Sequence, residues 1–144
     1  MPGLLLDTHA LVWFQSAQPM EEEALNAIVE AQNSHSLFVS PITAWEVAVL
    51  QQHPNPARRP NLLGHAAAIW FRNARRETGA QLVRIGVRIA LEAARVPADC
   101  DHKDPGDCYL IATARVRELA LVTRDVRIRD LTARDPAYLT TILC

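Results

Sequence analysis

Residues 102–123 read H-K-D-P-G-D-C-Y-L-I-A-T-A-R-V-R-E-L-A-L-V-T, and this stretch decides the fold. The part from Pro105 to about Glu118 is predicted to be a helix, since proline is favoured at the first helical position and apolar residues follow at helical spacing. Leu119 to Thr123 is a short, nearly continuous apolar run, which is typical of a strand buried on both faces. A helix that leads directly into such a strand predicts an α/β fold with a parallel sheet.

The rest of the chain repeats this alternation of strands and helices. Further strands are expected at residues 3–6, 36–39, 81–85 and 139–143, and further helices at about 20–32, 41–52, 62–77 and 88–95. Residues 96–103 are expected to be irregular. We therefore expect a three-layer α/β/α fold around a central, mainly parallel sheet, with residues 1–144 forming a single domain.

The composition argues against several classes of protein. The chain has 144 residues, a formal net charge of −1 and 49% hydrophobic residues, as expected of an ordinary globular domain. We find no signal peptide and no apolar run near the ~20 residues of a membrane span, so we expect a cytoplasmic protein without a membrane partner. The cysteines form no C-x-x-C pair and the histidines no H-x-x-x-H pair, which disfavours disulfide frameworks and zinc sites.

Two aspartates come just after predicted strands. Asp7 follows three leucines directly, and Asp125 lies two residues after Thr123. In open α/β sheets, ligands gather outside the carboxyl ends of the strands, so both side chains are candidates for a binding site. The alternatives are structural: Asp7 is also suited to cap a helix that starts at the next residue, and Asp125 is also suited to a turn.

Glu46 lies in a segment whose other spacing indicates a buried helix face. In S-P-I-T-A-W-E-V-A-V-L, Glu46 is four residues after Ile42 and three before Val49, so it falls on or beside the apolar stripe. An unpaired carboxylate is costly to bury. Glu46 therefore either reaches water at the edge of the stripe or faces a positive charge.

Asp104 and Asp107 precede the helix of the opening stretch. Asp104 is suited to the N-cap position, with Pro105 as the first helical residue. Capping explains Asp107 less well, because the residues four and seven positions later, Ile111 and Ala114, are apolar. Asp107 thus begins the buried stripe of this helix.

Taken together, these acids favour a metal site. Clustered carboxylates repel one another, and some hold protons at neutral pH unless a cation is present. Oxygen ligands suit Mg²⁺ or Mn²⁺, and such a site activates water and stabilises negative charge on a phosphate. The chain has no Walker loop and no G-x-G-x-x-G motif, so the usual backbone cradle for a nucleotide is absent.

Four motifs resemble those of the PIN-domain nucleases, and most of all the VapC toxins of bacterial toxin–antitoxin pairs. They are D-T-H-A-L-V-W from Asp7, the segment around Glu46, H-K-D-P-G-D-C-Y-L-I-A-T-A, and L-V-T-R-D ending at Asp125. The similarity runs from Leu4 to about Ile128. The order and spacing of the four motifs make it specific.

The resemblance implies a Mg²⁺- or Mn²⁺-dependent endoribonuclease built as one PIN-like domain. It assigns the family's four metal-binding acids, in chain order, to Asp7, Glu46, Asp107 and Asp125. The implied partners are an RNA substrate, a cognate VapB-type antitoxin and a second copy of the chain in a homodimer. Hydrolysis would leave a 5′-phosphate, and alanine in place of either Asp7 or Asp107 is expected to abolish cleavage without unfolding the protein.

Other residues match the family less uniformly. Asp104 matches an additional acid, and Thr8 and Thr123 match hydroxyl residues that hydrogen-bond the acids or waters. The family motif is usually D-P-F-D-R, whereas this chain has Gly106 in place of the aromatic residue and Cys108 in place of arginine. This departure puts the packing and charge beside the third acid in question.

Contact with RNA requires positive surface outside the acids. A backbone-binding rim is one interpretation of Arg72, Arg75 and Arg76, which share a helical spacing, and of Arg58 and Arg59 in the preceding loop. A solvated charged face is the other. Tryptophans can stack on bases, but the helical positions of Trp13, Trp45 and Trp70 favour core or dimer contacts.

Two other functions remain open from the sequence. An aspartate-nucleophile phosphatase would use the acid after the first strand, but its D-x-D-x-T motif has His9 at the third position here. A catalytically silent PIN-like module would bind RNA or a partner without cutting. The complete set of acids argues against this second alternative.

Overall fold

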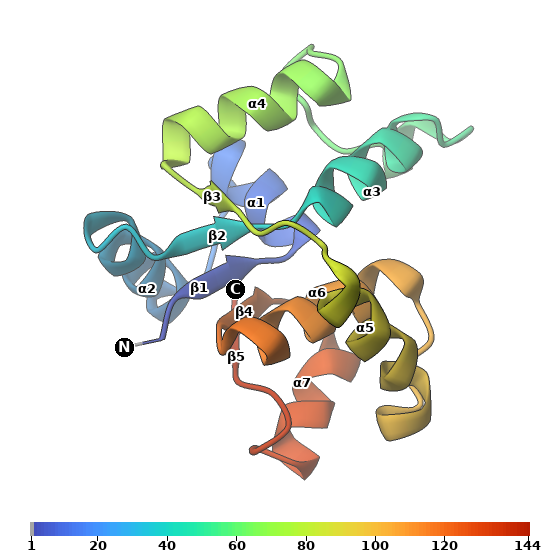
Figure 1. The fold of residues 1–144 in the computed structure, drawn as a ribbon. Coiled ribbons are helices and arrows are strands. Elements are labelled where there is room, and N and C mark those ends of the chain that lie inside the picture. Colours follow the sequence, from blue (N-terminus) through green and yellow to red (C-terminus); the bar gives the residue numbers. More distant parts are fainter. Residues whose placement is uncertain (1) are drawn as a thin grey trace.

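The computed structural model describes residues 2–144 and contains one five-stranded sheet in which every paired strand is parallel (Figure 1). The strand order is β3-β2-β1-β4-β5. The strands are short, and helices cover both faces of the sheet, as is usual for parallel sheets. They comprise β1 (Leu4–Leu6), β2 (Leu37–Val39), β3 (Gln81–Leu82), β4 (Ala120–Thr123) and β5 (Thr141–Leu143).

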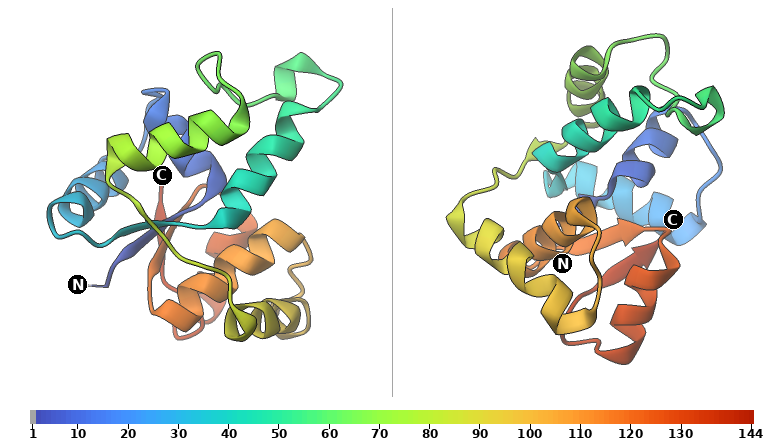
Figure 2. Two further views of the ribbon diagram at one scale, coloured as in Figure 1. Left: turned by 45° about the horizontal axis from the view of Figure 1, so that its top comes forward. Right: turned by 90° about the vertical axis from the view of Figure 1, so that its right-hand side faces the viewer.

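The helices form two layers, which confirms the expected α/β/α arrangement (Figure 2). One layer contains α1 (Thr8–Gln15), α2 (Glu22–Asn33) and α4 (Ala67–Thr78). The other contains α5 (Val87–Cys100), α6 (Pro105–Arg117) and α7 (Val126–Arg134). The helix α3 (Pro41–Gln51) packs against both α4 and α6 near the end of the sheet, and η1 (Pro56–Arg58) follows it.

The side chains of β1 show how three consecutive leucines hold the layers together. Leu4 and Leu6 point to the core shared with α1, α2 and α4, whereas Leu5 points to the core shared with α5, α6 and α7. This alternation follows from the two-residue period of a strand. All three side chains are buried, so β1 forms the centre of both cores.

The topology brings two of the candidate acids to one place. From β1 the chain continues to β2 on one side of it, whereas β4 lies on the other side. Ligands of parallel α/β sheets bind at positions of this kind, where the strand order reverses direction. Leu6 pairs with Val122 in the β1–β4 register, so Asp7 and Thr123 come next to each other at the carboxyl edge. Asp125 follows at the same edge.

The prediction that residues 96–103 are irregular is wrong up to Cys100, because α5 continues through Pro97. Proline removes one backbone donor and usually disrupts a helix. Here, buried Val96 packs in the core with α6, and the Pro97 carbonyl accepts a closing hydrogen bond from the Asp101 N–H at 2.9 Å. Packing against α6 therefore outweighs the local cost of the proline.

Other boundaries differ where local turns intervene. The helix predicted from residue 62 starts at Ala67 instead, since Leu63 and Gly64 have positive φ angles of 57° and 81°. Strands β3 and β5 are shorter than predicted, and α7 is a helix that the sequence patterns do not predict. Its N-cap is Asp125.

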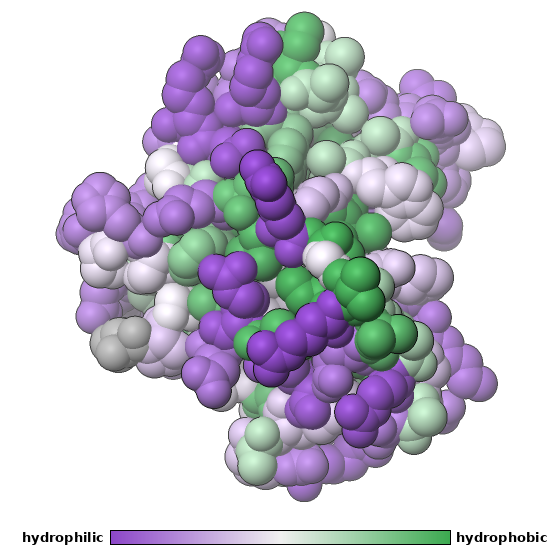
Figure 3. All heavy atoms as spheres, in the orientation of Figure 1, coloured by the Kyte–Doolittle hydropathy of each residue, from purple (hydrophilic) through white to green (hydrophobic). Residues whose placement is uncertain are grey.

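Some large apolar side chains stay at the surface. Val87 and Leu91, one turn apart on α5, are 76% and 65% exposed, and Figure 3 shows apolar atoms gathered over this helix. Trp45 and Val49, one turn apart on α3, are 54% and 47% exposed. Within residues 2–144, no helix has both the length and the apolar composition needed to span a membrane.

Candidate active site

Asp7 is both a helix cap and a buried acid. Its Oδ1 accepts a hydrogen bond from the Ala10 N–H at 2.7 Å, which is the capping role, while its backbone N–H donates to the Val122 carbonyl at 3.1 Å. The residue is only 6% exposed. Burial raises the pKa of Asp7 to about 6, although hydrogen bonds from Thr123 and from Ala10 oppose the rise.

Glu46 extends from α3 toward Asp7. The local sequence starts this helix with the Ser40 hydroxyl, which accepts from the Ile42 N–H at 3.1 Å, so Glu46 lies near the middle of α3. The Thr8 hydroxyl donates to Glu46 Oε1 at 2.9 Å. Burial raises the pKa of Glu46 to about 7, and the nearby charges of other acids, Asp107 above all, add to the rise.

Gly106 provides the space that the Glu46 carboxyl occupies. A Cβ atom at position 106 would lie 2.6 Å from Glu46 Cδ and less than 3 Å from both carboxylate oxygens. Such distances are incompatible with a side chain there unless Glu46 moves. The glycine that replaces the usual aromatic residue of the motif therefore permits close contact between α3 and the first turn of α6.

Asp104 caps α6 as predicted, and Asp107 faces inward. The exposed Asp104 accepts the Asp107 N–H at its Oδ1, at 3.0 Å. The Asp107 side chain is largely buried, with its Oδ2 2.8 Å from His102 Nε2. Burial raises the pKa of Asp107, while the hydrogen bond from His102 lowers it.

His102 is a candidate residue that sequence reasoning missed. It is 5% exposed, and its carbonyl accepts a hydrogen bond from Cys108 Sγ at 3.2 Å. Ligand atoms of His102, Asp107 and Asp125 all lie within 4.8 Å of one another. The sequence feature that could have identified His102 is its position five residues before Asp107 in the same motif. A search for the paired spacing of zinc-binding histidines does not find it.

Asp125 is the N-cap of α7 instead of the turn residue expected from the sequence, and it lines the same pocket as the other acids. Its Oδ1 accepts the Arg127 N–H at 2.9 Å, and its Oδ2 lies 3.5 Å from the Arg127 guanidinium. The Thr123 hydroxyl accepts the Asp125 N–H at 3.1 Å. Thr123 therefore connects Asp125 to Asp7, whose carboxyl it also hydrogen-bonds.

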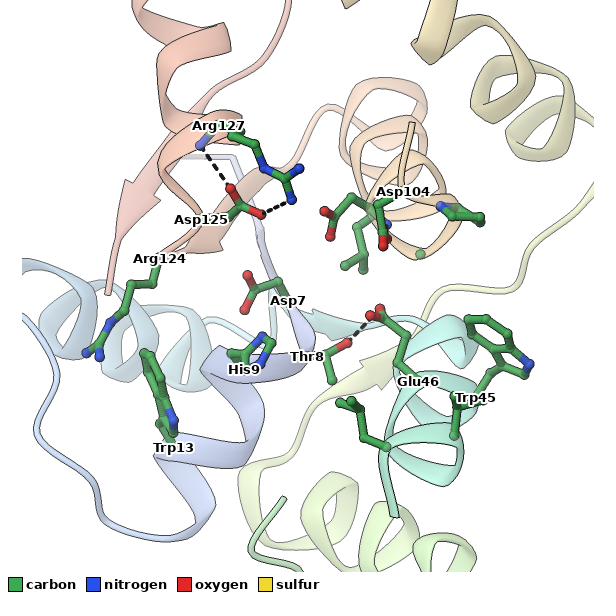
Figure 4. A pocket seen from close by; sticks show the side chains of 16 residues that line it. Asp7, Thr8, His9, Trp13, Trp45, Glu46, Asp104, Arg124, Asp125 and Arg127 are labelled. Carbon is green, nitrogen blue, oxygen red and sulfur yellow. Dashed lines mark hydrogen bonds and ion pairs between the residues drawn. The ribbon is translucent and has the colours of Figure 1, made fainter. Parts of the chain in front are cut away.

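All five candidate acids line one pocket of about 600 Å³, which we call the carboxylate pocket (Figure 4). They come from β1–α1, α3, α6 and the start of α7. Among residues 2–144, no lysine or arginine forms an ion pair with Asp7, Glu46 or Asp107. The set supplies hard oxygen ligands, and its three most buried members lack a neutralising lysine or arginine, so its chemistry fits a divalent metal ion. The acids are Asp7, Glu46, Asp104, Asp107 and Asp125.

The predicted arginine rim divides into two groups in the structure: Arg58 and Arg59 lie at the end of η1, and the other three lie on α4. Arg72 and Arg76 are exposed on α4, and Arg75 is partly buried, with its Nε lacking a hydrogen-bond partner. These three do not line the carboxylate pocket, whereas Arg124 and Arg127 do.

The tryptophans also differ from one another. Trp70 is 1% exposed and belongs to the core, as predicted, and Trp13 is partly buried against the same core. Trp45 is 54% exposed and lines the carboxylate pocket.

Comparison with known proteins gives a family and a fold. The model of the PIN domain family matches residues 4–133. Among solved structures, VapBC2 of Rickettsia felis bound to promoter DNA has a TM-score of 0.67 at 10% identity, covering 98% of each chain. DNA-bound VapBC of Salmonella typhimurium has a TM-score of 0.66 at 14% identity, covering 99% of this chain and 98% of the other.

A toxin–antitoxin complex from Klebsiella pneumoniae has a TM-score of 0.55 at 23% identity, covering 85% of this chain and 87% of the other. At these identities the structural likeness establishes the fold alone. No curated protein matches the sequence.

We predict that Asp7→Asn stabilises the metal-free protein near neutral pH. The folded state holds the Asp7 proton more tightly than the unfolded chain does. The bound proton therefore adds to the free energy of unfolding below pH about 4, and this contribution is lost as pH rises to about 6. At pH 7.5 the shift corresponds to a cost of up to about 3 kcal/mol, which asparagine removes while it still caps α1.

Urea denaturation in EDTA between pH 3.5 and 7.5 measures this effect. The difference between wild type and Asp7→Asn should appear as pH rises and shrink again when Mg²⁺ or Mn²⁺ is added, because the ion stabilises only the intact site. Exposed Asp130 on α7 provides a control, since Asp130→Asn should change little. A less stable Asp7→Asn protein at pH 7.5 contradicts the prediction.

We predict that Gly106→Ala weakens metal binding without unfolding the protein. The methyl group displaces the end of the flexible Glu46 side chain, so the free energy of unfolding should change by less than about 1 kcal/mol. The affinity for Mn²⁺ should fall about tenfold, as it does when a group that supports a metal ligand is removed. Calorimetric titration measures the affinity.

Gly86→Ala is the matched control, because a Cβ there meets no atom within 4 Å. Equal Mn²⁺ affinities for Gly106→Ala and Gly86→Ala would show that the space beside Gly106 has no role at the site.

Proposed function

The chain belongs to the PIN domain family, whose model matches residues 4–133, and we propose that it is a metal-dependent endoribonuclease. We further propose that it acts as the VapC-type toxin of a type II toxin–antitoxin system. PIN domains are typically nucleases, and the similar solved structures include toxin–antitoxin complexes. The observation that carries the proposal is the group of largely buried acids in the carboxylate pocket.

Burial and mutual repulsion explain why this group needs a cation. The pKa values of Asp7, Glu46 and Asp107 are all raised, with burial as the largest cause in each case. A protein gains no stability from such an arrangement in the absence of a partner. A bound divalent ion favours the charged form of each carboxyl group, so it compensates the energetic cost of burying these charges.

The oxygen-rich composition favours Mg²⁺, with Mn²⁺ as the alternative. Asp7 and Asp107 would hold the ion, and Glu46 and Asp125 would contact it directly or through water. Asp104 is exposed and already used as a cap, so it serves better as an outer acid at the mouth of the pocket.

Hydrogen bonds fix the orientation of each proposed ligand before any ion binds. Thr8 holds Glu46, and the first turn of α1 holds Asp7. His102 holds Asp107, and Arg127 holds Asp125. These contacts orient the carboxylates before an ion binds, which is the preorganisation that metal sites require.

Hydrolysis of RNA follows from this arrangement. A bound divalent ion supplies a Lewis acid that lowers the pKa of water and stabilises charge on the phosphate. The oxygen of water adds to phosphorus, the bond to the 3′ oxygen breaks, and the 3′ oxygen takes a proton. The products are a 5′-phosphate and a 3′-hydroxyl. The protein's part is to hold the oriented carboxylates in a largely buried pocket.

The exposed apolar side chains support partners beyond RNA. We propose that a VapB-type antitoxin lies across the carboxylate pocket, where Trp45 and Val49 are exposed beside the acids. We also propose a homodimer, for which the apolar surface of Val87 and Leu91 on α5 is a candidate face (Figure 3). Exposed apolar surface of this kind is typical of protein interfaces.

We predict that Asp107→Asn abolishes RNA cleavage. Asparagine keeps the shape of the side chain but removes its charge, so cleavage should fall by at least about 100-fold. Purified wild type and Asp107→Asn are incubated with total RNA in Mg²⁺, in Mn²⁺ or in EDTA. Cleavage by wild type should require the metal, and sequencing of the product ends identifies the cut site and its 5′-phosphate.

Asp130→Asn, which removes an equal charge from an exposed position, should cleave like wild type. Absence of cleavage by wild type in every buffer, with metal binding intact, would instead indicate a silent module that binds RNA or a partner. Cleavage by Asp107→Asn at the wild-type rate would remove this acid from the site.

A further inference from the structure

The carboxylate pocket adjoins a second pocket that no part of the proposed chemistry uses. This second pocket has a volume of about 270 Å³, and we call it the arginine pocket because Arg58 and Arg59 line it. The two pockets share Thr8, His9 and Trp13 on α1 as well as Leu50 on α3. We refer to the two adjoining pockets together as the groove, which extends from the acids, along the shared residues of α1, to the loop after α3.

The two ends of this groove carry opposite charges. Asp7, Glu46 and Asp107 lie at one end, and Arg58 and Arg59 lie at the other. Among residues 2–144, neither arginine forms an ion pair with a carboxylate. Their charge is therefore available to an anion in the groove.

The loop that presents these arginines is held by its own hydrogen bonds. Arg59 Nε donates to the His53 carbonyl at 2.8 Å, which fixes the base of the guanidinium. The Asn55 side chain accepts the Ala57 N–H at 3.0 Å and caps η1. The Asn61 side chain accepts the Leu63 N–H at 3.1 Å. An ordered loop loses less entropy when it binds a ligand than a mobile one does.

Three planar groups, from His9, Trp13 and Arg124, lie close to one another beside the acids. The Arg124 guanidinium lies 3.4 Å from the centre of the Trp13 ring, and Arg124 Nε donates to the Cys144 carbonyl at 2.9 Å. The ring of His9 lies 6.0 Å from that of Trp13, at an angle of 56°. His9 is exposed, whereas Trp13 is partly buried, so of the two rings that line both pockets His9 is the one that a base can contact (Figure 4).

We propose that this groove binds consecutive nucleotides of single-stranded RNA, with one phosphate at the carboxylates, an adjacent base against His9, and a neighbouring phosphate at Arg58 and Arg59. The proposal rests on the proposed function, since it extends the same substrate beyond the cleaved bond. Every nucleotide of RNA carries a phosphate. When one phosphate of the strand lies at the acids, the neighbouring phosphates of the strand therefore lie close to the acids as well. The acids repel those neighbouring phosphates, so positively charged side chains are needed to bind them. Single-strand sites commonly combine such cations with stacking surfaces.

The other arginines of the chain offer a control with the same charge change. Arg72 and Arg76 are exposed on α4, and they line neither of the two pockets. A general attraction of RNA to positive surface would involve them as much as Arg58 and Arg59. A defined groove would not.

We predict that Arg58→Gln/Arg59→Gln weakens RNA binding and that Arg72→Gln/Arg76→Gln does not. Both pairs are introduced into Asp107→Asn protein, in which the RNA stays intact. Anisotropy of a fluorescein-labelled 12-nucleotide RNA of mixed sequence is measured with Mg²⁺ between 50 and 300 mM salt. The first pair should bind about tenfold more weakly at 100 mM salt, and its salt slope should fall by about 0.7 for each phosphate that the protein no longer neutralises. The second pair should change affinity less than about twofold.

His9 tests the stacking step separately. His9→Ala should weaken binding about fivefold, and His9→Phe should restore most of the affinity, because phenylalanine keeps a planar ring. A loss in His9→Phe as large as that in His9→Ala would overturn the stacking role. Circular dichroism of each variant confirms that the fold is retained.

The outcomes separate this proposal from the proposed function. If Arg58→Gln/Arg59→Gln and Arg72→Gln/Arg76→Gln bind RNA equally well, or are weakened equally, the proposal that the groove binds RNA is overturned, even if wild type cleaves RNA. The same conclusion follows if the parent protein does not bind the RNA. Selective weakening by Arg58→Gln/Arg59→Gln supports the groove even if wild type cleaves nothing, in which case the ribonuclease function fails and an RNA-binding module remains.

Discussion

The burial of several neighbouring carboxylates is the constraint on which the functional end of this molecule depends. The sheet brings Asp7 and Asp125 to one edge, α6 adds Asp107, and α3 adds Glu46. Burial raises the pKa values of Asp7, Glu46 and Asp107, and this is an energetic cost for the metal-free protein. The two hydrophobic cores on either side of β1 have to offset that cost. A site that destabilises its own fold in this way is typical of residues kept for function.

Capping and ligand binding are compatible roles for these acids. Asp7, Asp104 and Asp125 each accept a backbone N–H at the start of a helix, so capping was correctly predicted for Asp7 and Asp104, and Asp125 is a cap where a turn was expected. A carboxylate has two oxygens, however, and the capping contact uses only one of them. The contact also fixes the direction of the second oxygen. For Asp7, the sequence alternatives of cap and site residue therefore describe two halves of one arrangement, whereas the second oxygen of Asp125 lies 3.5 Å from the Arg127 guanidinium.

The fold and the position of the acids could be predicted because they depend on short-range patterns. Alternating apolar segments define the layers, and a parallel sheet gathers the residues after its strands at one edge. Pro97 inside α5 could not be foreseen, because packing against α6 decides it. The same holds for His102, whose importance depends on a 2.8 Å contact across a turn, and for Gly106, whose neighbour Glu46 comes from another helix. The division of the arginines between α4 and the groove likewise depends on tertiary structure.

The departure from the family motif follows from the same constraint. The usual motif supplies an arginine one residue after the third acid, whereas this chain has Cys108, which is buried and donates to the His102 carbonyl. That contact helps to hold His102 against Asp107, so a neutral hydrogen-bonding group replaces a fixed positive charge beside the acids. Cys108 leaves less positive charge beside the acids than arginine would, and Gly106, which changes no charge, makes room for the Glu46 carboxyl at the first turn of α6. The same two changes that depart from the motif thereby strengthen the physical case for a bound divalent cation.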